Sequence, residues 1–436
     1  MERSTQLVVV ESNKEWDSFL TKFKSESSVI VPVQCDDNKH PLATNLCLLY
    51  VRMLDDNTEE YILPFRHSDA MNLKNKQLYQ IKTEQKVYTY DKKKLLHLLQ
   101  LENIDDIQMK SYLDKNVPMP IDEITTNSHD YFNRVYWGKS NINCIIPIMK
   151  HLEKSRLVVA EITKGVFGSI QECFSTYNND VIPNLYSIEK NGLQTTDGMV
   201  YSEYNPYTAT GRPSNRFGGI NFAALNKKDG SRKKFISRYG EDGILVEMDY
   251  DAYHLRLIGE VVGYKFPKGS VHKHMSKLYK VGYDEAKSLS FQYLYGHIPD
   301  DVLKSNPFFR KVQVYINDTW NSYKSNNFVE SDIYNKRIYK SNLSDMNKNK
   351  LFNYLVQLME TENNMRVLTK LLPKINGYKS KIILYSYDSF LFDVHKDDGM
   401  EFVKMVKAVV ESRGKYPVRV SKGLNYHKME DITEKL

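Results

Sequence analysis

The stretch GILVEMDYDAYHLRLIGEVVG, residues 243–263, changes its periodicity part-way through and has an acidic residue at the change. Residues 244–246 form a short apolar run that is typical of a buried strand. From Ala252 onward the apolar residues recur at helical spacing, which predicts a helix. Asp249 therefore lies at a predicted strand-to-helix junction.

A second acidic residue lies in KIILYSYDSFLFDV, residues 381–394. Its apolar runs predict two strands of a hairpin with Tyr387, Asp388 and Ser389 at the bend. Either aspartate alone could equally be a helix cap or a turn former. Together, two carboxylates on adjacent strand tips suit Mg²⁺, which needs oxygen ligands held near octahedral geometry.

Between these segments lies YDEAKSLSFQYLYGHIPD, residues 283–300. Lys287, Phe291 and Tyr295 recur every four residues, so they share one face of a helix that ends at Gly296. This face could be an ordinary core stripe, although the lysine would then have to reach out to solvent. Alternatively, the lysine holds a phosphate while an aromatic ring stacks on a base or sugar.

Length and composition limit the class of protein. A chain of 436 residues exceeds what one core usually supports, so two or more domains are expected. The net charge of +7 permits a polyanionic partner without requiring one. No apolar run approaches a membrane span and the amino terminus becomes polar too soon for a signal peptide, so we expect a cytoplasmic protein without membrane contact. The spacing of the cysteines does not suggest a zinc site.

The pattern of apolar and polar residues differs between regions of the sequence. Residues 1–140 alternate β-branched runs with helical stretches, which predicts a mixed domain on a small sheet. Residues 141–190 keep helical spacing, and from about residue 195 strand-like runs return between helices. Two polar segments, 322–332 and 340–350, are expected to be exposed loops. The predicted fold class is α/β, in the mixed α+β sense.

The order of these motifs resembles that of family A DNA polymerases, the bacterial DNA polymerase I group and its phage relatives. The matching motifs are TATGR at 208–212, DYxxxxLR at 249–256, the K-x3-F-x3-Y-G helix and the aspartate in an aromatic hairpin. Weaker matches are an R-x-x-F, an N-x-P-x-Q segment without its proline, and a closing G-x-N-W. They fall on Arg232 with Phe235, on Asn353 with Gln357, and on residues 423–429.

The resemblance implies a right-hand polymerase that covers residue 140 to the end of the chain. Its parts would be a thumb at 141–195, a palm at 196–261 and 346–436, and fingers at 262–345. The palm would bind two Mg²⁺ ions, with Mn²⁺ as a substitute, through Asp249, Asp388 and Tyr250. Its partners would be primer-template DNA and dNTPs.

Roles for the nucleotide-binding residues are implied by the same resemblance. Lys287 would bind the incoming triphosphate, Phe291 would pack on its sugar and base, and Tyr295 would close the pocket beside the templating base. His272 matches a fingers histidine that touches phosphate, although a solvated surface histidine fits the sequence equally well.

The resemblance also implies a set of DNA contacts. Arg212 would test the shape of the primer-end base pair in the minor groove, where acceptors lie at nearly the same place for every correct pair. Asn353 and Gln357 share a helix face and could do the same on the template, or be ordinary surface amides. The run 226–235 is either a phosphate-contacting loop or a solvated lysine-rich face. Its candidate contacts are Lys227, Lys228, Arg232 and Lys233.

The chain departs from the family pattern at three positions of the site. His254 stands where a glutamate usually blocks the ribonucleotide 2′-hydroxyl, and we still expect deoxynucleotides to be preferred. Ser389 stands where a further carboxylate follows the second aspartate. Tyr283 replaces a fingers arginine, and Lys273 or Lys280 could supply the missing cation.

The first domain resembles the RNase H-like 3′-5′ exonuclease domain that precedes the polymerase in this family. The active form needs D-x-E in its first strand, where this chain has Pro32 and Gln34. Two further family aspartates fall near Lys93 and at Ser140. Without these carboxylates there is no two-metal site, so we expect a degenerate domain that has lost hydrolysis.

The sequence therefore predicts a template-directed DNA polymerase of phage type without proofreading, located in the cytoplasm of a host cell if viral. A single-subunit RNA polymerase and a non-catalytic primer-template-binding protein are the alternatives. The sequence leaves open whether a processivity factor, a helicase or a primase works with this protein.

Overall fold

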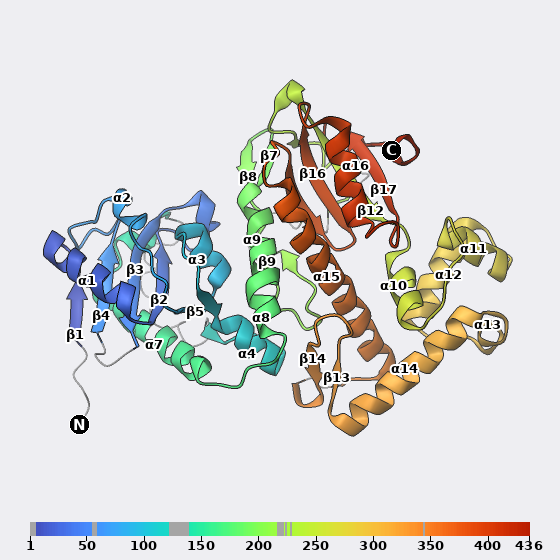
Figure 1. The fold of residues 1–436 in the computed structure, drawn as a ribbon, viewed down its shortest axis with the longest axis horizontal. Helices are drawn as coiled ribbons and strands as arrows, with labels where there is room; N and C mark the ends of the chain where they lie inside the picture. The colour runs from blue at the N-terminus through green and yellow to red at the C-terminus, as the bar shows by residue number, and fades with distance from the viewer. Residues whose placement is uncertain are drawn as a thin grey trace. The chain divides into compact units, whose positions relative to one another are not determined.

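The computed structural model describes residues 6–54, 59–121, 139–215, 222, 225–226, 229–342 and 345–436. The chain divides into two compact units, Met1–Tyr186 and Ser187–Leu436 (Figure 1). This division agrees with the expectation that a chain of this length needs more than one core. In the described part of the chain, none of the helices combines the length and apolar character that a bilayer crossing requires.

The first unit is built on a six-stranded sheet with the order β1-β4-β3-β2-β5-β6. Its strands are β1 (Gln6–Val9), β2 (Ser28–Gln34), β3 (Leu46–Met53), β4 (Glu59–Pro64), β5 (Val87–Thr89) and β6 (Ile104–Asp106). The central strands β2, β3 and β4 are antiparallel, whereas β5 and β6 are parallel to β2, and β1 is parallel to β4. The predicted mixed domain on a small sheet is confirmed.

Helices cover both faces of this sheet because its strands are apolar on both sides (Figure 1). On one face α1 (Asn13–Ser25) packs through Trp16, Phe19 and Phe23, beside α3 (Lys92–Leu98). On the other face lies α7 (Ile148–Val166). Among the described residues, the unit also contains α2 (Asn75–Leu78), α4 (Ile107–Lys115), α8 (Phe174–Thr176) and a π-helical turn, Tyr177–Val181.

The helical character predicted for residues 141–190 is confirmed by α7, α8, the π-helical turn and α9 (Ile182–Asn191). The apolar face of α7 is part of the core under the sheet, together with Val29 and Val31. The assignment of 141–195 as a thumb stays a prediction.

The second unit contains a five-stranded antiparallel sheet with the order β15-β16-β12-β17-β18. The strands are β12 (Gly243–Tyr250), β15 (Lys381–Ser386), β16 (Ser389–His395), β17 (Val418–Gly423) and β18 (Glu430–Asp431). The predicted strand before Asp249 and the predicted hairpin around Asp388 are both confirmed. Smaller sheets are formed by β7 (Leu193–Thr195) with β8 (Gly198–Val200) and β11 (Phe235–Ile236), by β9 (Tyr204–Asn205) with β10 (Ser214–Asn215), and by β13 (Phe328–Glu330) with β14 (Arg337–Tyr339).

Helices of the second unit form their own apolar core, which includes Leu255, Met275, Phe308 and Phe309. The helices are α10 (Tyr253–Val261), α11 (Val271–Tyr279), α12 (Tyr283–Tyr295), α13 (Asp300–Ser305), α14 (Pro307–Asn326), α15 (Lys348–Ile375) and α16 (Gly399–Val410). The long helix α15 packs on α10, α12, α14 and α16, so it connects the sheet region to the helical region (Figure 1).

The expectation of an exposed loop at residues 322–332 is wrong. Residues up to Asn326 complete α14, and β13 pairs with β14 directly afterwards. Tyr323 and Val329 are buried in a small satellite core with Ile338, which gives this polar segment an apolar anchor. The segment 340–350 contains a short 3-10 turn, Lys340–Asn342, and the first turn of α15.

A buried carboxylate on β16 links the five-stranded sheet to the segment that precedes β12. Asp393 is fully buried and accepts hydrogen bonds from Ser237 and from the Arg238 backbone and side chain. We expect Asp393→Ala to lower the free energy of unfolding by about 3 kcal/mol, because Arg238 then loses its charged partner. Urea denaturation measures this change. As a control, Lys404→Ala, which removes an exposed ion pair with Glu401, should cost no more than about 0.5 kcal/mol; equal effects would contradict the prediction.

Candidate functional site

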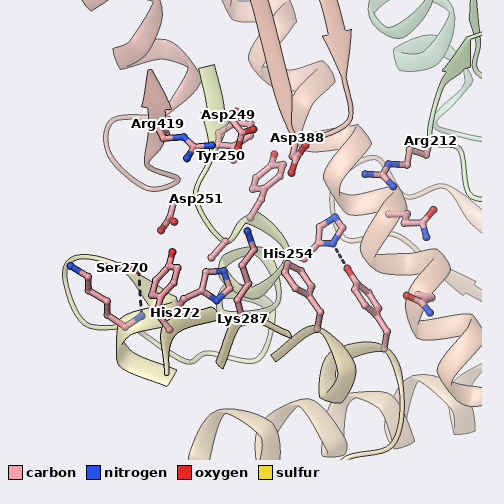
Figure 2. Close-up of a pocket in the computed structure, with 18 residues that line it drawn as sticks. Arg212, Asp249, Tyr250, Asp251, His254, Ser270, His272, Lys287, Asp388 and Arg419 are labelled. Carbon is pink, nitrogen blue, oxygen red and sulfur yellow. Dashed lines mark hydrogen bonds between the residues drawn. The ribbon is translucent and has the colours of Figure 1, made fainter. Parts of the chain in front are cut away.

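A cavity of about 740 Å³ opens where β12 and the β15–β16 hairpin meet α10, α11, α12 and α15. The predicted residues that line it are Arg212, Asp249, Tyr250, His254, His272, Tyr283, Lys287, Phe291, Tyr295, Asn353, Gln357 and Asp388 (Figure 2). Residues from separate stretches of the sequence are therefore brought to one place.

The two predicted aspartates lie on neighbouring segments of the sheet, Asp249 near the end of β12 and Asp388 in the turn between β15 and β16. In the register of β12 and β16, Asp249 is directly opposite Ser389, and the Tyr250 backbone N–H donates to the Asp388 carbonyl at 3.0 Å. Burial, together with the negative charges of Asp249 and Glu360, raises the pKa of Asp388 to about 6. Asp249 thus lies close enough to Asp388 to repel it, as Figure 2 also shows.

The turn that carries Asp388 is fixed from α15. Tyr387 adopts a left-handed conformation, with φ of +56°, as the tight two-residue hairpin requires. Asn364 of α15 donates to the Tyr387 carbonyl at 2.7 Å and to the Tyr385 hydroxyl at 3.2 Å. A buried amide of α15 therefore anchors the turn that carries Asp388.

Two neighbours of the aspartates have side chains that are committed elsewhere. The Tyr250 hydroxyl is buried and donates to the Val410 carbonyl at 2.9 Å, so only its main-chain carbonyl could be a metal ligand. The Ser389 hydroxyl donates to the Ser386 carbonyl at 3.2 Å within the hairpin.

The predicted stripe on α12 lines the cavity, and its last member, Tyr295, also packs against the helical core. The buried residues of this helix are Ala286, Ser290 and Leu294, each one position before a member of the stripe. Phe291 and Tyr295 stack with their ring centroids 6.2 Å apart. An ordinary core stripe therefore does not describe Lys287, which is exposed, whereas Tyr295 is shared between the cavity wall and the core.

His272 is also part of the cavity wall. Only 3% of its surface is exposed, and its ring packs at 5.9 Å from Tyr283 and 6.0 Å from Phe291. Burial lowers the pKa of His272, with Asp251 acting in the opposite direction. The alternative of a solvated surface histidine is therefore wrong.

The TATGR segment forms a turn that aims Arg212 at the site. Gly211 has a φ of +73° and donates to the Thr208 carbonyl at 2.9 Å, while the Thr208 hydroxyl donates to the Arg212 carbonyl at 2.9 Å. The Arg212 guanidinium lies 3.7 Å from the centre of the Tyr387 ring. It also pairs with Glu360, with Nε 3.0 Å from Oε2 and Nη2 donating to Oε1 at 3.1 Å.

The same glutamate reaches His254, whose Nε2 lies 3.2 Å from Glu360 Oε2. A hydrogen bond joins His254 Nδ1 and the Tyr295 hydroxyl (Figure 2). Burial and the negative charge of Glu360 raise the pKa of Tyr295, so this phenol stays protonated. The contacts Arg212–Glu360–His254–Tyr295 thus form a continuous network.

Predicted DNA contacts in the run 226–235 lie away from the cavity or cannot be placed. Arg232 is buried, donates to the Leu225 carbonyl and lies 4.3 Å from the centre of the Tyr426 ring. These protein contacts give its guanidinium a structural role. Lys233 is exposed, and Lys227 and Lys228 lie outside the described residues.

Sequence reasoning did not select Asp251, Ser270, Arg419 or Glu360. Asp251 lines the cavity and pairs with Arg256 at 3.1 Å. Arg419 also lines it, directly opposite Asp249 in the register of β12 and β17. Glu360 lies three residues after Gln357 on α15, a spacing that places it near the cavity side of the helix but does not reveal its partners. Of the two lysines suggested to replace the fingers arginine, Lys273 lines the cavity and Lys280 does not.

In the first unit, the positions compared with exonuclease carboxylates are buried at Pro32, Gln34 and Lys93 and exposed at Ser140. The Gln34 amide is buried and donates to the Asp36 and Lys39 carbonyls, each at 2.9 Å. Lys93 is buried on α3. Gln34 therefore fixes the loop after β2.

Comparisons with known proteins give a structural match without a sequence match. Neither a scan against protein-family models nor a search of curated protein sequences finds a relative. Among solved structures, the chain is similar to the POL domain of Pol1 from M. smegmatis in complex with DNA primer-template and dNTP, with a TM-score of 0.68. The two share a polymerase fold. The likeness covers 96% of this chain and 99% of that chain at 12% sequence identity, so it establishes the fold alone.

Proposed function

We propose that this protein is a template-directed DNA polymerase of the family A type, related to phage enzymes, that adds dNTPs to a primer 3′-hydroxyl. The observation that carries the proposal is the proximity of Asp249, near the end of β12, to Asp388, in the adjacent hairpin turn, in a cavity that also contains Lys287. The polymerase fold supports it independently.

The two carboxylates fit divalent cations. Their mutual repulsion, which contributes to the raised pKa of Asp388, would be relieved by a cation between them. Asp249, Asp388 and the Tyr250 carbonyl would hold two Mg²⁺ ions, or Mn²⁺ as a substitute. When bound, such ions lower the pKa of the primer hydroxyl and neutralise charge on the triphosphate and the leaving pyrophosphate.

The chain's own residues would orient the substrates. Lys287 places a positive charge on the side of the cavity that faces the aspartates, where it would bind the triphosphate, with Lys273 and Arg419 as further cations. Phe291 and Tyr295 would pack on the nucleotide, and His254 would border its sugar. His272 and Tyr283 would complete this wall. Arg212, Asn353 and Gln357 would contact the primer-template.

The domain assignments belong to the same proposal. The thumb would be 141–195, the palm 196–261 and 346–436, and the fingers 262–345. Residues 1–140 would be a degenerate exonuclease-like domain without proofreading. The order β4-β3-β2-β5-β6, with three antiparallel strands followed by two parallel ones, supports an RNase H-like origin for it.

Primer extension tests the proposal. The purified protein, supplied with Mg²⁺ and a labelled primer-template, should extend the primer with dNTPs and do so poorly with rNTPs. Better extension with rNTPs would favour the RNA polymerase alternative. Binding of primer-template without extension in Mg²⁺ or Mn²⁺ would leave only the alternative of a non-catalytic binding protein. This outcome is tested because Ser389 and Tyr283 depart from the family pattern.

A further inference from the structure

Glu360 is a fully buried carboxylate at the centre of the site, although it does not line the cavity. A buried charge is costly unless it is paired, so its partners matter. Here they are Arg212 and His254, which come from separate parts of the chain. One side chain of α15 thus fixes two side chains that border the cavity.

The contacts to Arg212 fix the orientation of its guanidinium group. Glu360 engages Nε and Nη2, and the Tyr387 ring lies against the guanidinium plane. A planar guanidinium that is held on one edge and one face is pre-organised for contacts by its remaining edge. The side chain is 23% exposed, so that edge can be reached from outside.

His254, which lies near Glu360, also contacts a residue of α12. The imidazole Nε2 lies 3.2 Å from Glu360 Oε2, and Nδ1 shares a hydrogen bond with the Tyr295 hydroxyl, so a turn of the ring would lose that hydrogen bond and separate Nε2 from the carboxylate. Tyr295 in turn stacks on Phe291. The position of the aromatic face of α12 therefore depends on a carboxylate that lies outside the cavity.

We infer that Glu360 is a positioning residue that couples the Arg212 contact to the His254–Tyr295 wall. The inference rests on the proposed polymerase function: one carboxylate aligns the group that would meet the primer end with the groups that would meet the incoming nucleotide. Loss of Glu360 would loosen both together, without removing any group that touches substrate.

A double-mutant cycle tests this coupling by single-nucleotide incorporation on a primed template. Glu360→Gln and His254→Gln should each lower kcat/KM for dNTP by about tenfold, mainly through KM, and the double variant should lose about tenfold and not about a hundredfold. As a matched control, Glu362 is another buried glutamate of α15, which accepts hydrogen bonds from Ser331 and from the Tyr334 backbone and does not line the cavity. Glu362→Gln should combine additively with His254→Gln.

A swap variant separates positioning from general stability. His254→Glu alone would place two carboxylates together and should depress incorporation strongly, whereas His254→Glu with Glu360→Gln restores a single carboxylate opposite Arg212. We expect the combined variant to recover to within about fivefold of wild type. If Glu360→Gln does not fold, Glu360→Asp replaces it in the cycle, since its shorter side chain cannot reach both partners.

Additive losses in the cycle, or equal activity of His254→Glu with and without Glu360→Gln, would overturn the inference. Absence of extension by the wild type would instead overturn the proposed function. In that case the coupling is measured by binding: Glu360→Gln and Arg212→Ala should weaken primer-template affinity non-additively, and additive effects would reject it.

Discussion

Replacement of Asp249 by asparagine is expected to lower the rate of primer extension by about a thousandfold or more while making the metal-free protein more stable. The rate falls because a neutral amide is a poor ligand for Mg²⁺ and several kcal/mol of charge stabilisation is lost. Stability rises because Asp249 repels the buried Asp388. A gain of about 1 kcal/mol is expected, since burial is the larger cause of the raised pKa of Asp388.

The two effects are measured by primer extension and by urea denaturation without divalent cations. Glu430→Gln is the control, because Glu430 is an exposed carboxylate on β18 of the same sheet and pairs with the exposed Lys435. It should change neither quantity appreciably. Loss of stability in Asp249→Asn would contradict the proposed repulsion.

The pH dependence of stability has a defined sign. The pKa of Asp388 is about 6 in the folded protein and near 3.8 in the unfolded chain, so the folded state binds the proton more tightly. The contribution of this group to stability therefore falls as the pH rises from about 4 to 6, and its full cost is present above that range. In Asp249→Asn the same slope should be smaller.

Replacement of Lys287 by alanine is expected to raise KM for dNTPs by about a hundredfold. Lys287 is exposed on α12 and Figure 2 shows it directed into the cavity toward the two aspartates. A charge-assisted contact to a triphosphate oxygen is stronger than a neutral hydrogen bond, and the cavity partly shields it from water. Steady-state incorporation kinetics measure the effect.

A matched control separates local charge from net charge. Lys280→Ala removes another exposed cation, from the end of α11 and outside the cavity. It should leave KM nearly unchanged, and Lys287→Arg should recover part of the affinity. A similar KM for both alanine variants would mean that Lys287 acts through long-range charge and not through contact.

Much of the site could be predicted because its residues stand at abrupt changes of periodicity. The strand before Asp249, the hairpin at Asp388 and the helix of Lys287 each have a clear local signal, and the structure confirms these elements. Which face of α12 meets the core was less certain. Local spacing groups Lys287 with Phe291 and Tyr295 but does not say what the group faces.

Other features depend on tertiary contacts that local sequence patterns do not contain. Glu360 lies in a helix where a single glutamate looks like a surface residue until Arg212 and His254 are placed beside it. The segment around Tyr323 looked like a loop because its polar residues outnumber the two apolar anchors. Arg232 matched a motif by spacing, yet its guanidinium is buried against Tyr426.

The helix α15 bears Asn353, Gln357, Glu360 and Asn364 at intervals of four, three and four residues. Side chains at these intervals lie on one side of an α-helix. Each added or deleted residue would rotate the remainder of the helix by about 100°. An insertion between Gln357 and Glu360 would therefore rotate Asn353 and Gln357 relative to Glu360 and Asn364. The first two residues and the contacts to Arg212 and Tyr387 could then no longer face the site together. A point substitution on α15 would disturb one of these contacts, whereas a change in its length would disturb several at once.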